Sequence, residues 1–454
     1  MTTFVPALNS AMQSLLANQL GLSVASKNIS NAQTPGYSRE RLILAPSSPD
    51  GVDVVGVEAL RDKLAIQRFN QETSYKSTQD TLQQGLQDIQ GSFNDTKGTG
   101  LLSFITGFFN SFQSLSVDPT SMTNREAVKQ AAQSLINVFH SQASGLNNQQ
   151  RTANQAVATD VDNINSLTSQ IAKLTKQIQV EEIPGNPPPN ELRDQRAQLV
   201  QKLSQTVDVH QIDSNGTYEL YVGSGRTVVL NGDSQNLTTA PDTNGLYRVK
   251  AGNYDITSEI AGGDLQGQLQ LRDQNIPAYL NQLDQLAYAV AQQVNTIHSA
   301  AYSLDGNTGI NFFAPLSTAS GAASAIALSS DVATSTRNIA ASQNSTAAGD
   351  NAAAIAIGNL LHAPVFSGGG SVTDQYGALV FNIGNDAANA KANFQEHDAL
   401  ATQLQNRMQA MSGVSVDEET VQILQFQRSF QASAKVISTV DQLLQTALAM
   451  VSTA

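Results

Sequence analysis

Five histidines are the first residues to test for chemistry, because imidazole serves both as a metal ligand and as a general base. They are scattered along the chain at positions 140, 210, 298, 362 and 397, and neither an HExxH nor a His-x-His motif occurs. The chain has no cysteine, which excludes disulfides, thiolate metal sites and cysteine nucleophiles. The sequence therefore predicts no metal ion, no cofactor and no catalytic residue of these kinds.

Two glycine-containing loops have only a superficial likeness to functional loops. The segment 223–225, Gly-Ser-Gly, matches neither the GxSxG turn of hydrolases nor the GxxxxGK[ST] phosphate loop. Residues 305–309 begin like a calcium loop but lack the glycine at the sixth position and the glutamate at the twelfth. The acidic runs 181–182 and 417–419 are interpreted as helix-end charges. We therefore expect a protein that is not an enzyme.

The charge of the chain argues against two large classes of partner. Its 454 residues carry 25 basic and 38 acidic side chains, a formal net charge of −13. Nucleic acids and anionic membranes both call for clustered positive charge, so neither is expected as a main partner. No apolar stretch is long enough to span a membrane, and the N-terminus lacks the features of a secretory signal. Charged residues make up only 14% of the chain, so its surface can be buried in an assembly at low desolvation cost.

The elements that would position any site are clearest at the N-terminus. Four large apolar residues recur every seven positions, and smaller residues occupy the second position of the repeat: Leu8, Leu15, Leu22 and Ile29, with Ala11, Asn18 and Ala25 between them. This pattern predicts a helix with a coiled-coil-type seam that ends near Pro35 and Gly36. The only charged side chain in residues 1–38 is Lys27.

The C-terminus repeats the arrangement over residues 422–454, which hold only three charged groups. Its seam consists of Ile423, Phe430, Ile437, Leu444 and Val451, with Phe426, Ser433, Val440 and Ala447 at the second position. One seam on each end predicts that the two terminal helices pair with each other as a coiled coil. The pattern alone equally allows an ordinary parallel or antiparallel pair that closes one domain. The other faces carry amide, hydroxyl and Ala side chains instead of Glu and Lys, so we expect them to be buried against further copies or neighbours.

Between the ends the fold class is mainly α with inserted β. A strand is predicted at 52–57, followed by a helical stripe of Leu82, Leu86, Ile89 and Phe93. A helix from about 62 to Ser74 is implied only by the family resemblance given below. Four phenylalanines form an aromatic cluster that we assign to the core: Phe104, Phe108, Phe109 and Phe112. Two further helices are predicted over about 124–147 and 150–181, and a return helix to about 206 completes an αα-hairpin.

These patterns divide the chain into four parts. Residues 1–40 and 415–454 are the paired terminal helices, and 41–206, 266–302 and 373–414 form a helical core domain. Residues 207–265 form a small β-rich outer domain, because Asn-Gly pairs at 215–216, 231–232 and 244–245 separate short β-rich runs. Residues 303–372 form a mixed, variable outer region. A break at 412–413 separates the last helix of the core from the C-terminal helix.

Both ends also resemble one known family. The run at 28–37, Asn-Ile-Ser-Asn-Ala-Gln-Thr-Pro-Gly-Tyr, is similar to the N-terminal signature of bacterial flagellar axial proteins, the rod, hook and hook-associated proteins. Its signature residues here are Asn28, Asn31, Thr34, Gly36 and Tyr37. Residues 412–419 and 425–437 resemble the other end of the same family. The GDGFF-like motif of hook and distal rod proteins is absent, and 50–57, 192–199, 267–295 and 348–351 resemble hook-associated members.

The resemblance implies a structural junction protein of the bacterial flagellum. It implies a short ring of subunits between hook and filament, with the terminal helices lining the inner tube as assembly seams. The implied partners are other copies of the chain, the hook protein, the next hook-associated protein on the filament side, and a cytosolic export chaperone on the C-terminal helix. The implied route is export from the cytoplasm through the flagellar type III apparatus to an extracellular position at the junction.

Two other functions stay open at this point. A hook- or distal-rod-type subunit would polymerise into a long tube, whereas an adaptor would stop after a short segment. An axial frame bearing an adhesive or enzymatic outer domain would carry its activity in 207–265 or 303–375. The lack of a paired acid–base or nucleophile motif argues against an enzyme, while glycan binding by the β-rich region is compatible with the sequence.

Overall fold

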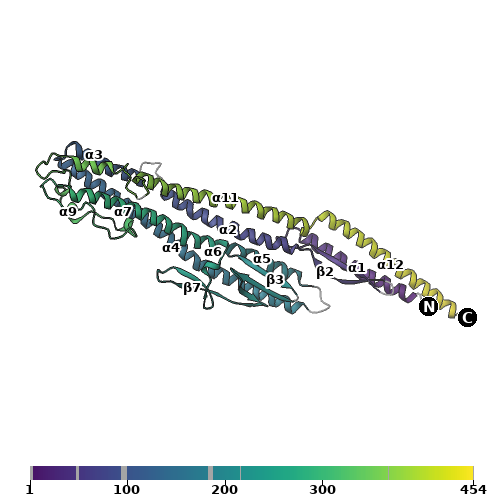
Figure 1. Ribbon diagram of the computed structural model, residues 1–454. Helices are drawn as coiled ribbons and strands as arrows, with labels where there is room; N and C mark the ends of the chain where they lie inside the picture. The colour runs from purple at the N-terminus through teal and green to yellow at the C-terminus, as the bar shows by residue number, and fades with distance from the viewer. Residues whose placement is uncertain are drawn as a thin grey trace.

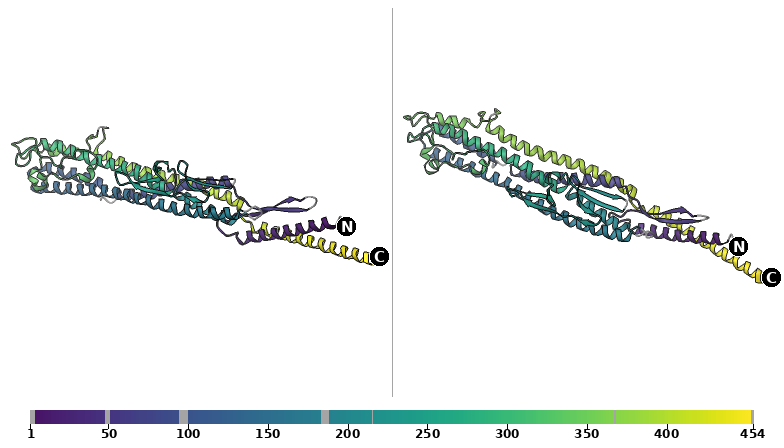
Figure 2. Two further views of the ribbon diagram at one scale, coloured as in Figure 1. Left: turned by 90° about the horizontal axis from the view of Figure 1, so that it is seen from below. Right: turned by 60° about the horizontal axis from the view of Figure 1, so that its bottom comes forward.

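The computed structural model describes residues 4–47, 51–93, 100–182, 188–214, 216–366 and 368–452. The chain forms a long, narrow rod with both termini close together at one tip (Figure 1). Three parts follow one another along the rod: the terminal helix pair, a body of long helices with small sheets on one side, and a far end of short helices and loops (Figures 1 and 2). This confirms the expected fold class, mainly α with inserted β and packed terminal helices.

Long helices set the length of the rod. Helix α2 (Lys63–Ser92) runs from the terminal pair toward the far end, α4 (Met122–Glu181) returns along the body, and α11 (Val372–Ser412) lies against α2 (Figure 1). The other helices are α1 (Phe4–Ser30), α3 (Leu101–Val117), α5 (Asn190–Thr206), α6 (Gly263–Gln270), α7 (Ile276–Ala300), α8 (Ala322–Ala325), α9 (Ser330–Thr334), α10 (Ala352–Asn359) and α12 (Val416–Ser452). Helix α11 ends at Ser412, so the predicted break before the C-terminal helix is confirmed.

Two helices are longer than the sequence pattern predicts. The prediction of separate helices over 124–147 and 150–181 is wrong, because α4 is one continuous helix of 60 residues. Helix α2 likewise continues to Ser92 and does not end at Ser74. Neither helix contains a proline, and both bury residues along their whole length. Tertiary packing therefore keeps these helices continuous where the apolar periodicity of the sequence is weak.

In the residues that the structure describes, the strands form three small antiparallel sheets. Strands β1 (Glu40–Pro46) and β2 (Val52–Ala59) make a hairpin beside α1. One sheet holds β3 (Val209–Ser214), β4 (Thr217–Val222), β5 (Arg226–Leu230) and β6 (Asp233–Ser234), and another holds β7 (Leu237–Pro241), β8 (Tyr247–Ala251) and β9 (Tyr254–Asp255). Asn231 and Gly232 join β5 to β6 with positive φ, as the sequence predicts. The pair at 244–245 lies in a longer loop from 242 to 246, and Asn215 lies outside the described residues.

The core of the body has two parts. Around α3, the rings of Phe108, Phe109 and Phe112 are fully buried and meet Phe312 and Phe313 from the far-end loops. This confirms the predicted aromatic core, with Phe104 packed against its edge. In the second part the C-terminal half of α4 and helix α5 pack against β3–β9. The sheets at 207–265 therefore share their core with the helices.

A buried histidine holds the far-end loops in place. His298, at the end of α7, is fully buried. Its Nε2 accepts a hydrogen bond from the backbone N–H of Ala340 at 2.8 Å, so the ring proton is on Nδ1, which donates to the carbonyl oxygen of Ile310 at 2.7 Å. Burial lowers the pKa of His298 to about 4, the Ile310 bond opposes this, and the positive charge of Arg125 adds to the decrease.

We therefore expect acid to weaken the far end. The unfolded chain takes up a proton at the ordinary histidine pKa, near 6.5, whereas the folded chain resists protonation of His298 until about pH 4. Stability should be full above pH 6.5 and should fall as the pH drops from 6.5 toward 4. Thermal unfolding across this range should show the loss in the parent chain and in His362→Gln, an exposed control in the same region, but not in His298→Gln. Equal pH dependence in all three would contradict the prediction.

Candidate functional site at the elbow

The terminal helices α1 and α12 form an antiparallel pair that projects from the body (Figures 1 and 2). Residues 31–39 lead from α1 into β1, and residues 413–415 join α11 of the body to α12. We call these two connections, with the residues at the adjoining ends of α1, α11, α12 and β1, the elbow. The β1–β2 hairpin lies along α1 on the same side of the elbow. Whatever the terminal pair contacts is therefore oriented by the elbow.

Helix α1 buries mainly small residues. Six of its positions are buried: Ala11, Ala17, Gly21, Val24, Ala25 and Asn28. The Cα of Gly21 faces Phe426, and a Cβ at this position would lie 2.6 Å from the ring. The predicted N-terminal seam residues, Leu8, Leu15, Leu22 and Ile29, are half-buried. They flank this closest contact, because small side chains let two helix axes approach more closely than leucines do.

The predicted C-terminal seam lies on the partly covered side of α12. Val440 is buried, and Ile423, Phe426, Phe430, Ile437 and Leu444 are half-buried. The side chain of Val451 lies outside those that the structure describes. Other apolar residues of α12, such as Val421 and Val436, are about half exposed, at 53% and 46%. The helix therefore has a covered apolar stripe and additional apolar side chains outside it.

Asn28 is the centre of the elbow. Its side chain is 1% exposed and makes four hydrogen bonds. The Nδ2 group donates to the carbonyl oxygen of Glu40 at 2.8 Å and to Oε2 of Glu419 at 3.0 Å. The Oδ1 atom accepts from the hydroxyl of Tyr37 at 2.8 Å and from the backbone N–H of Glu40 at 2.9 Å. One side chain thus joins the end of α1, the start of β1 and the first turn of α12, and all its polar capacity is used.

Ion pairs surround this asparagine. The Nε of Arg39 donates to Oε1 of the buried Glu419 at 2.7 Å, and its Nη1 contacts Oε2 of Glu418 at 2.8 Å. Lys27 lies 3.0 Å from the buried carboxylate of Glu40. Glu419 is 1% exposed, so its negative charge depends on Arg39 and Asn28 for compensation. Of the three acids interpreted as helix-end charges, Glu419 is therefore a buried structural group, because the fold brings Arg39 next to it.

The remaining signature residues shape the turn after α1. Asn31 donates from Nδ2 to the carbonyl oxygen of Lys27 at 3.0 Å, and Thr34 donates to Oδ1 of Asn31 at 3.2 Å. Burial raises the pKa of Tyr37 above its ordinary value, and the nearby Glu40 raises it further. Tyr37 therefore stays protonated and can donate to Asn28 at any physiological pH. The five residues that the family resemblance singled out act together as a local scaffold.

Gly36 occupies a position that only glycine suits. Its φ is +76°, and a Cβ would lie 2.2 Å from the side chain of Gln198, which donates to the carbonyl oxygen of Pro35. We expect Gly36→Ala to lower stability by about 1–2 kcal/mol for the left-handed backbone, with a further loss as Gln198 is displaced. Gly245→Ala is a matched control, because φ is +79° there and a Cβ would meet open space. Thermal unfolding should show a larger loss of stability for Gly36→Ala than for Gly245→Ala. Equal losses would show that the contact with Gln198 does not contribute.

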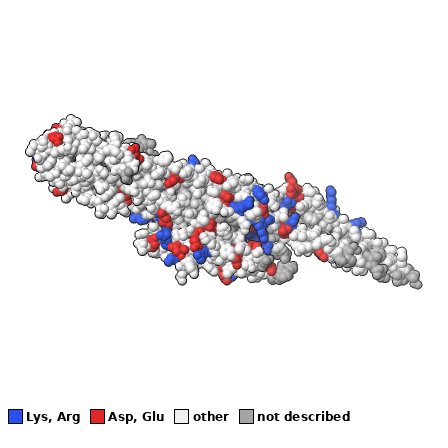
Figure 3. Space-filling model, viewed as in Figure 1, with Lys and Arg blue, Asp and Glu red and all other residues white. Residues whose placement is uncertain are grey.

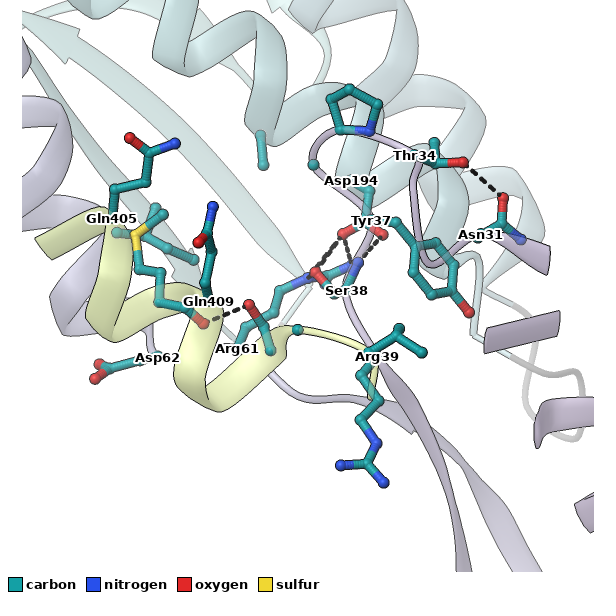
Figure 4. A pocket seen from close by; sticks show the side chains of 18 of the residues that line it. Asn31, Thr34, Tyr37, Ser38, Arg39, Arg61, Asp62, Asp194, Gln405 and Gln409 are labelled. Atoms are coloured by element: carbon teal, nitrogen blue, oxygen red, sulfur yellow. Dashed lines mark hydrogen bonds and ion pairs between the residues drawn. The ribbon is translucent and has the colours of Figure 1, made fainter. Parts of the chain in front are cut away.

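A second group of bonds ties the elbow to the body. Asp194 of α5 accepts from the backbone N–H and the hydroxyl of Ser38 at 3.0 and 2.7 Å. Arg61 donates to the same carboxylate at 2.7 Å (Figure 4) and to the carbonyl oxygen of Asn190 at 3.0 Å. The backbone N–H of Arg39 donates to the carbonyl oxygen of Ser412, which joins the two connections directly. The elbow is therefore held on both sides.

A crevice of about 810 Å³ lies between the elbow and the body (Figure 4). Polar side chains such as Asn31, Gln198, Gln405 and Gln409 line much of it, with Tyr37 and Met408 among them. Its ionisable groups serve the ion pairs of the elbow or cap α2, as Asp62 does by accepting from Ala65 at 2.9 Å. The hydroxyl of Ser38 lies beside the carboxylate of Asp194, but both groups are buried and Arg61 pairs with the carboxylate. The arrangement is therefore suited to holding chain segments in a fixed orientation.

Sequence reasoning did not identify Arg39, Glu40, Arg61, Asp194 and Glu419 as site residues. One feature of the sequence points to such residues: charged side chains are rare near both ends of the chain, and Arg39 follows the signature directly. Within the described ranges, no cluster of three His, Cys, Asp or Glu side chains is placed to hold a metal ion. None of the helices described there is long and apolar enough to cross a membrane.

Comparison with known proteins gives agreement over nearly the whole chain. The family described as "Flagellar hook-associated protein FlgK helical domain" matches residues 86–313, and "Flagellar basal body rod FlgEFG protein C-terminal" matches 405–450. The chain is 29% identical to flagellar hook-associated protein 1 of Bacillus subtilis, over 98% of each chain. It is 26% identical to the protein of the same name from Salmonella typhimurium, over 96% of this chain and 98% of the relative.

A solved structure shares the fold. The flagellar hook junction protein FlgK from Burkholderia pseudomallei aligns with a TM-score of 0.68 at 18% identity. The alignment covers 76% of this chain and 100% of that one.

Proposed function

Because this chain belongs to the FlgK family of flagellar hook-associated proteins, we propose that it is a subunit of the hook–filament junction whose terminal helix pair makes the assembly contacts. The family is structural, so the chain is an extracellular flagellar component and not an enzyme. The neighbours that its family membership implies are the hook and the filament. The elbow would fix the direction in which the helix pair leaves the body.

The observation that carries this proposal is the uncovered apolar surface of the terminal pair. Val5, Met12 and Leu16 of α1, with Val436 and Leu443 of α12, are between 46% and 61% exposed. Lys27 is the only charged residue of α1. Exposed apolar side chains on a helix pair with few charges mark a surface that associates with another protein.

The finer features of the proposal follow from this surface. Copies of the chain would form a ring through their terminal pairs, with the N-terminal seam (Leu8, Leu15, Leu22, Ile29) and the C-terminal seam (Ile423, Phe426, Phe430, Ile437, Val440, Leu444, Val451) holding each pair together. One side of the ring would contact the hook protein and the other the next hook-associated protein. Before export by the type III apparatus, the apolar face of α12 would be covered by a cytosolic chaperone.

Electron microscopy of purified hooks mixed with the full-length chain tests the proposal. A short cap on each hook is the expected result. The variant Val436→Asp places a charge on the exposed apolar face while leaving the buried side of α12 intact, so it should fold normally and leave hooks bare. The variant Thr439→Asp, on an exposed polar position nearby, should still form caps. Capping by Val436→Asp at normal levels would contradict the role of this face.

The match of residues 405–450 to a rod-protein family supports a second candidate, a hook- or rod-type subunit. Such a subunit would extend the hook into a long tube, and the same micrographs would show it. Relatives that match over 96–98% of the chain carry the name hook-associated protein 1, which favours the junction. The proposed adhesive activity of the β-rich region has no such support.

A further inference from the structure

A small cavity rich in basic residues lies beside the elbow, where α5, β3 and the start of α2 meet. Its volume is about 250 Å³. Four basic side chains, Arg61, Lys63, Arg193 and Arg196, line it together with the acidic Glu182 and Asp213. Basic side chains gather on this part of the surface, whereas the far end shows almost none on the same face (Figure 3). The cavity therefore has a positive balance in a chain whose net charge is −13.

The cations of this cavity have donors that protein groups do not use. Arg196 is only 7% exposed, yet a single nitrogen of its guanidinium, Nη2, bonds to a carboxylate, that of Asp213. Arg193 is 32% exposed and pairs with Glu182. Lys63 is exposed and has no hydrogen-bond or ion-pair partner among the described residues. A buried guanidinium whose N–H groups make no hydrogen bond destabilises the fold, unless another acceptor binds those groups.

A second and independent observation concerns Tyr218, which also lines the cavity. Its side chain is 3% exposed, and the guanidinium of Arg196 lies over its ring at 3.7 Å from the centroid. The hydroxyl oxygen is buried and has no hydrogen-bond partner among the described residues. Buried hydroxyl groups are nearly always bonded, so this one leaves a donor beside the cavity for a water molecule or an anion bound there.

The local electrostatics support the same conclusion. Burial lowers the pKa of Arg193, Asp213 opposes the change, and the positive charges of Arg61 and Arg196 lower it further. The arginines therefore repel one another in a partly desolvated place. A negative group among them would relieve this repulsion, and planar guanidinium groups match the oxygens of carboxylate and phosphate.

We propose that this cavity is an anion-binding site that takes one oxyanion group, a carboxylate or a phosphate, through Lys63, Arg193, Arg196 and the hydroxyl of Tyr218. The volume of about 250 Å³ is large enough for one such group. Because Arg61 also bonds Asp194 of the elbow, an anion bound here would stiffen the joint from the side of the body. The site is separate from the apolar assembly face and does not depend on it.

Titration of the full-length chain with sodium phosphate, and separately with sodium acetate, tests the site. Calorimetry at constant ionic strength should show saturable binding of one equivalent. Lys63→Gln and Tyr218→Phe should each weaken it about tenfold, as expected for the loss of one charge-assisted hydrogen bond. Lys391→Gln, an exposed lysine of α11, is the matched control and should bind as the parent chain does.

Tyr218→Phe is the sharpest variant, because it removes only an unbonded buried hydroxyl. Without phosphate its unfolding temperature should equal or exceed that of the parent chain, so a weaker binding constant would not reflect misfolding. Saturable binding of phosphate alone would identify phosphate as the ligand, and comparable binding of acetate would identify a carboxylate. No saturable binding of either anion, or binding unchanged in both Lys63→Gln and Tyr218→Phe, would overturn the proposal.

Discussion

Asn28→Asp is expected to release the terminal helices from the body. The substitution replaces the Nδ2 donor with an oxygen that faces Oε2 of Glu419 and the carbonyl oxygen of Glu40, at the positions now bonded at 3.0 and 2.8 Å. Two carboxylates would then share a site from which water is excluded. Leaving a buried charge uncompensated costs about 3–5 kcal/mol, so we expect the contact between α1 and α12 near the elbow to open at neutral pH.

The same substitution three residues later provides the control. Asn31 has the same side chain and also belongs to the signature, but it is only half-buried, and its side chain bonds the Lys27 carbonyl oxygen and the Thr34 hydroxyl. Asn31→Asp should cost only the modest penalty of a negative charge at a helix C-terminus, about 0.3–1 kcal/mol. Amide hydrogen exchange over α1 and α12 should accelerate strongly in Asn28→Asp and little in Asn31→Asp.

The effect of Asn28→Asp should also depend on pH. One carboxyl group of a close pair takes up a proton more readily than an isolated one, because protonation removes the repulsion. The unfolded chain lacks this pair, so the loss of stability caused by Asn28→Asp should be largest above pH 7 and should decrease as the pH falls toward 5. Equal exchange in the two aspartate variants, or damage that grows in acid, would contradict the proposed role of Asn28.

Val440→Asp is expected to separate the two terminal helices along their length. Val440 is 7% exposed on the covered side of α12, so the new carboxylate would have to leave water without a partner. An unpaired buried charge costs several kcal/mol. Two helices with few other contacts are not expected to stay paired after such a loss of stability. Circular dichroism should show a decrease of helical signal, and hydrogen exchange should locate the decrease in α1 and α12.

Val436→Asp is the matched variant one turn away. The valine there is 46% exposed, so the same charge stays in water and the helix pair should keep its signal. Both variants should fail to cap hooks, Val440→Asp because the pair is disrupted and Val436→Asp because its outer face is charged. Loss of helical signal in both, or in neither, would show that the covered and exposed sides of α12 are not distinguished as the structure has them.

Sequence patterns predicted the terminal pair because the relevant information is periodic and local. The seven-residue repeats of Leu8 to Ile29 and Ile423 to Leu444 define two apolar stripes, and the lack of charge shows that both need cover. The turn at Asn231 was also predicted from its Asn-Gly pair, since few residues other than Gly accept a positive φ. The aromatic cluster of α3 was predicted for the same reason, as three large rings lie on one face of a single helix.

Other features depend on groups that are distant in sequence. Asn28 and Glu419 lie 391 positions apart in the sequence, so no local pattern indicates their hydrogen bond. Glu419 looks like its neighbour Glu418, and only the position of Arg39 in space makes it a buried anchor. The length of α4 likewise follows from its packing against both halves of the body. The sequence of α4 alone does not indicate these contacts.

The sequence by itself determined the composition of each surface: where apolar stripes, charge-poor faces and glycine-dependent turns occur, because these follow from residue type and spacing. The tertiary structure alone decided which of these surfaces meet. It set the antiparallel order of the terminal helices, placed the small residues of α1 against Phe426, and turned five separated polar residues into the elbow. The physical reason is that burial and the pairing of charge are properties of neighbours in space, and the chain supplies those neighbours only once it has folded.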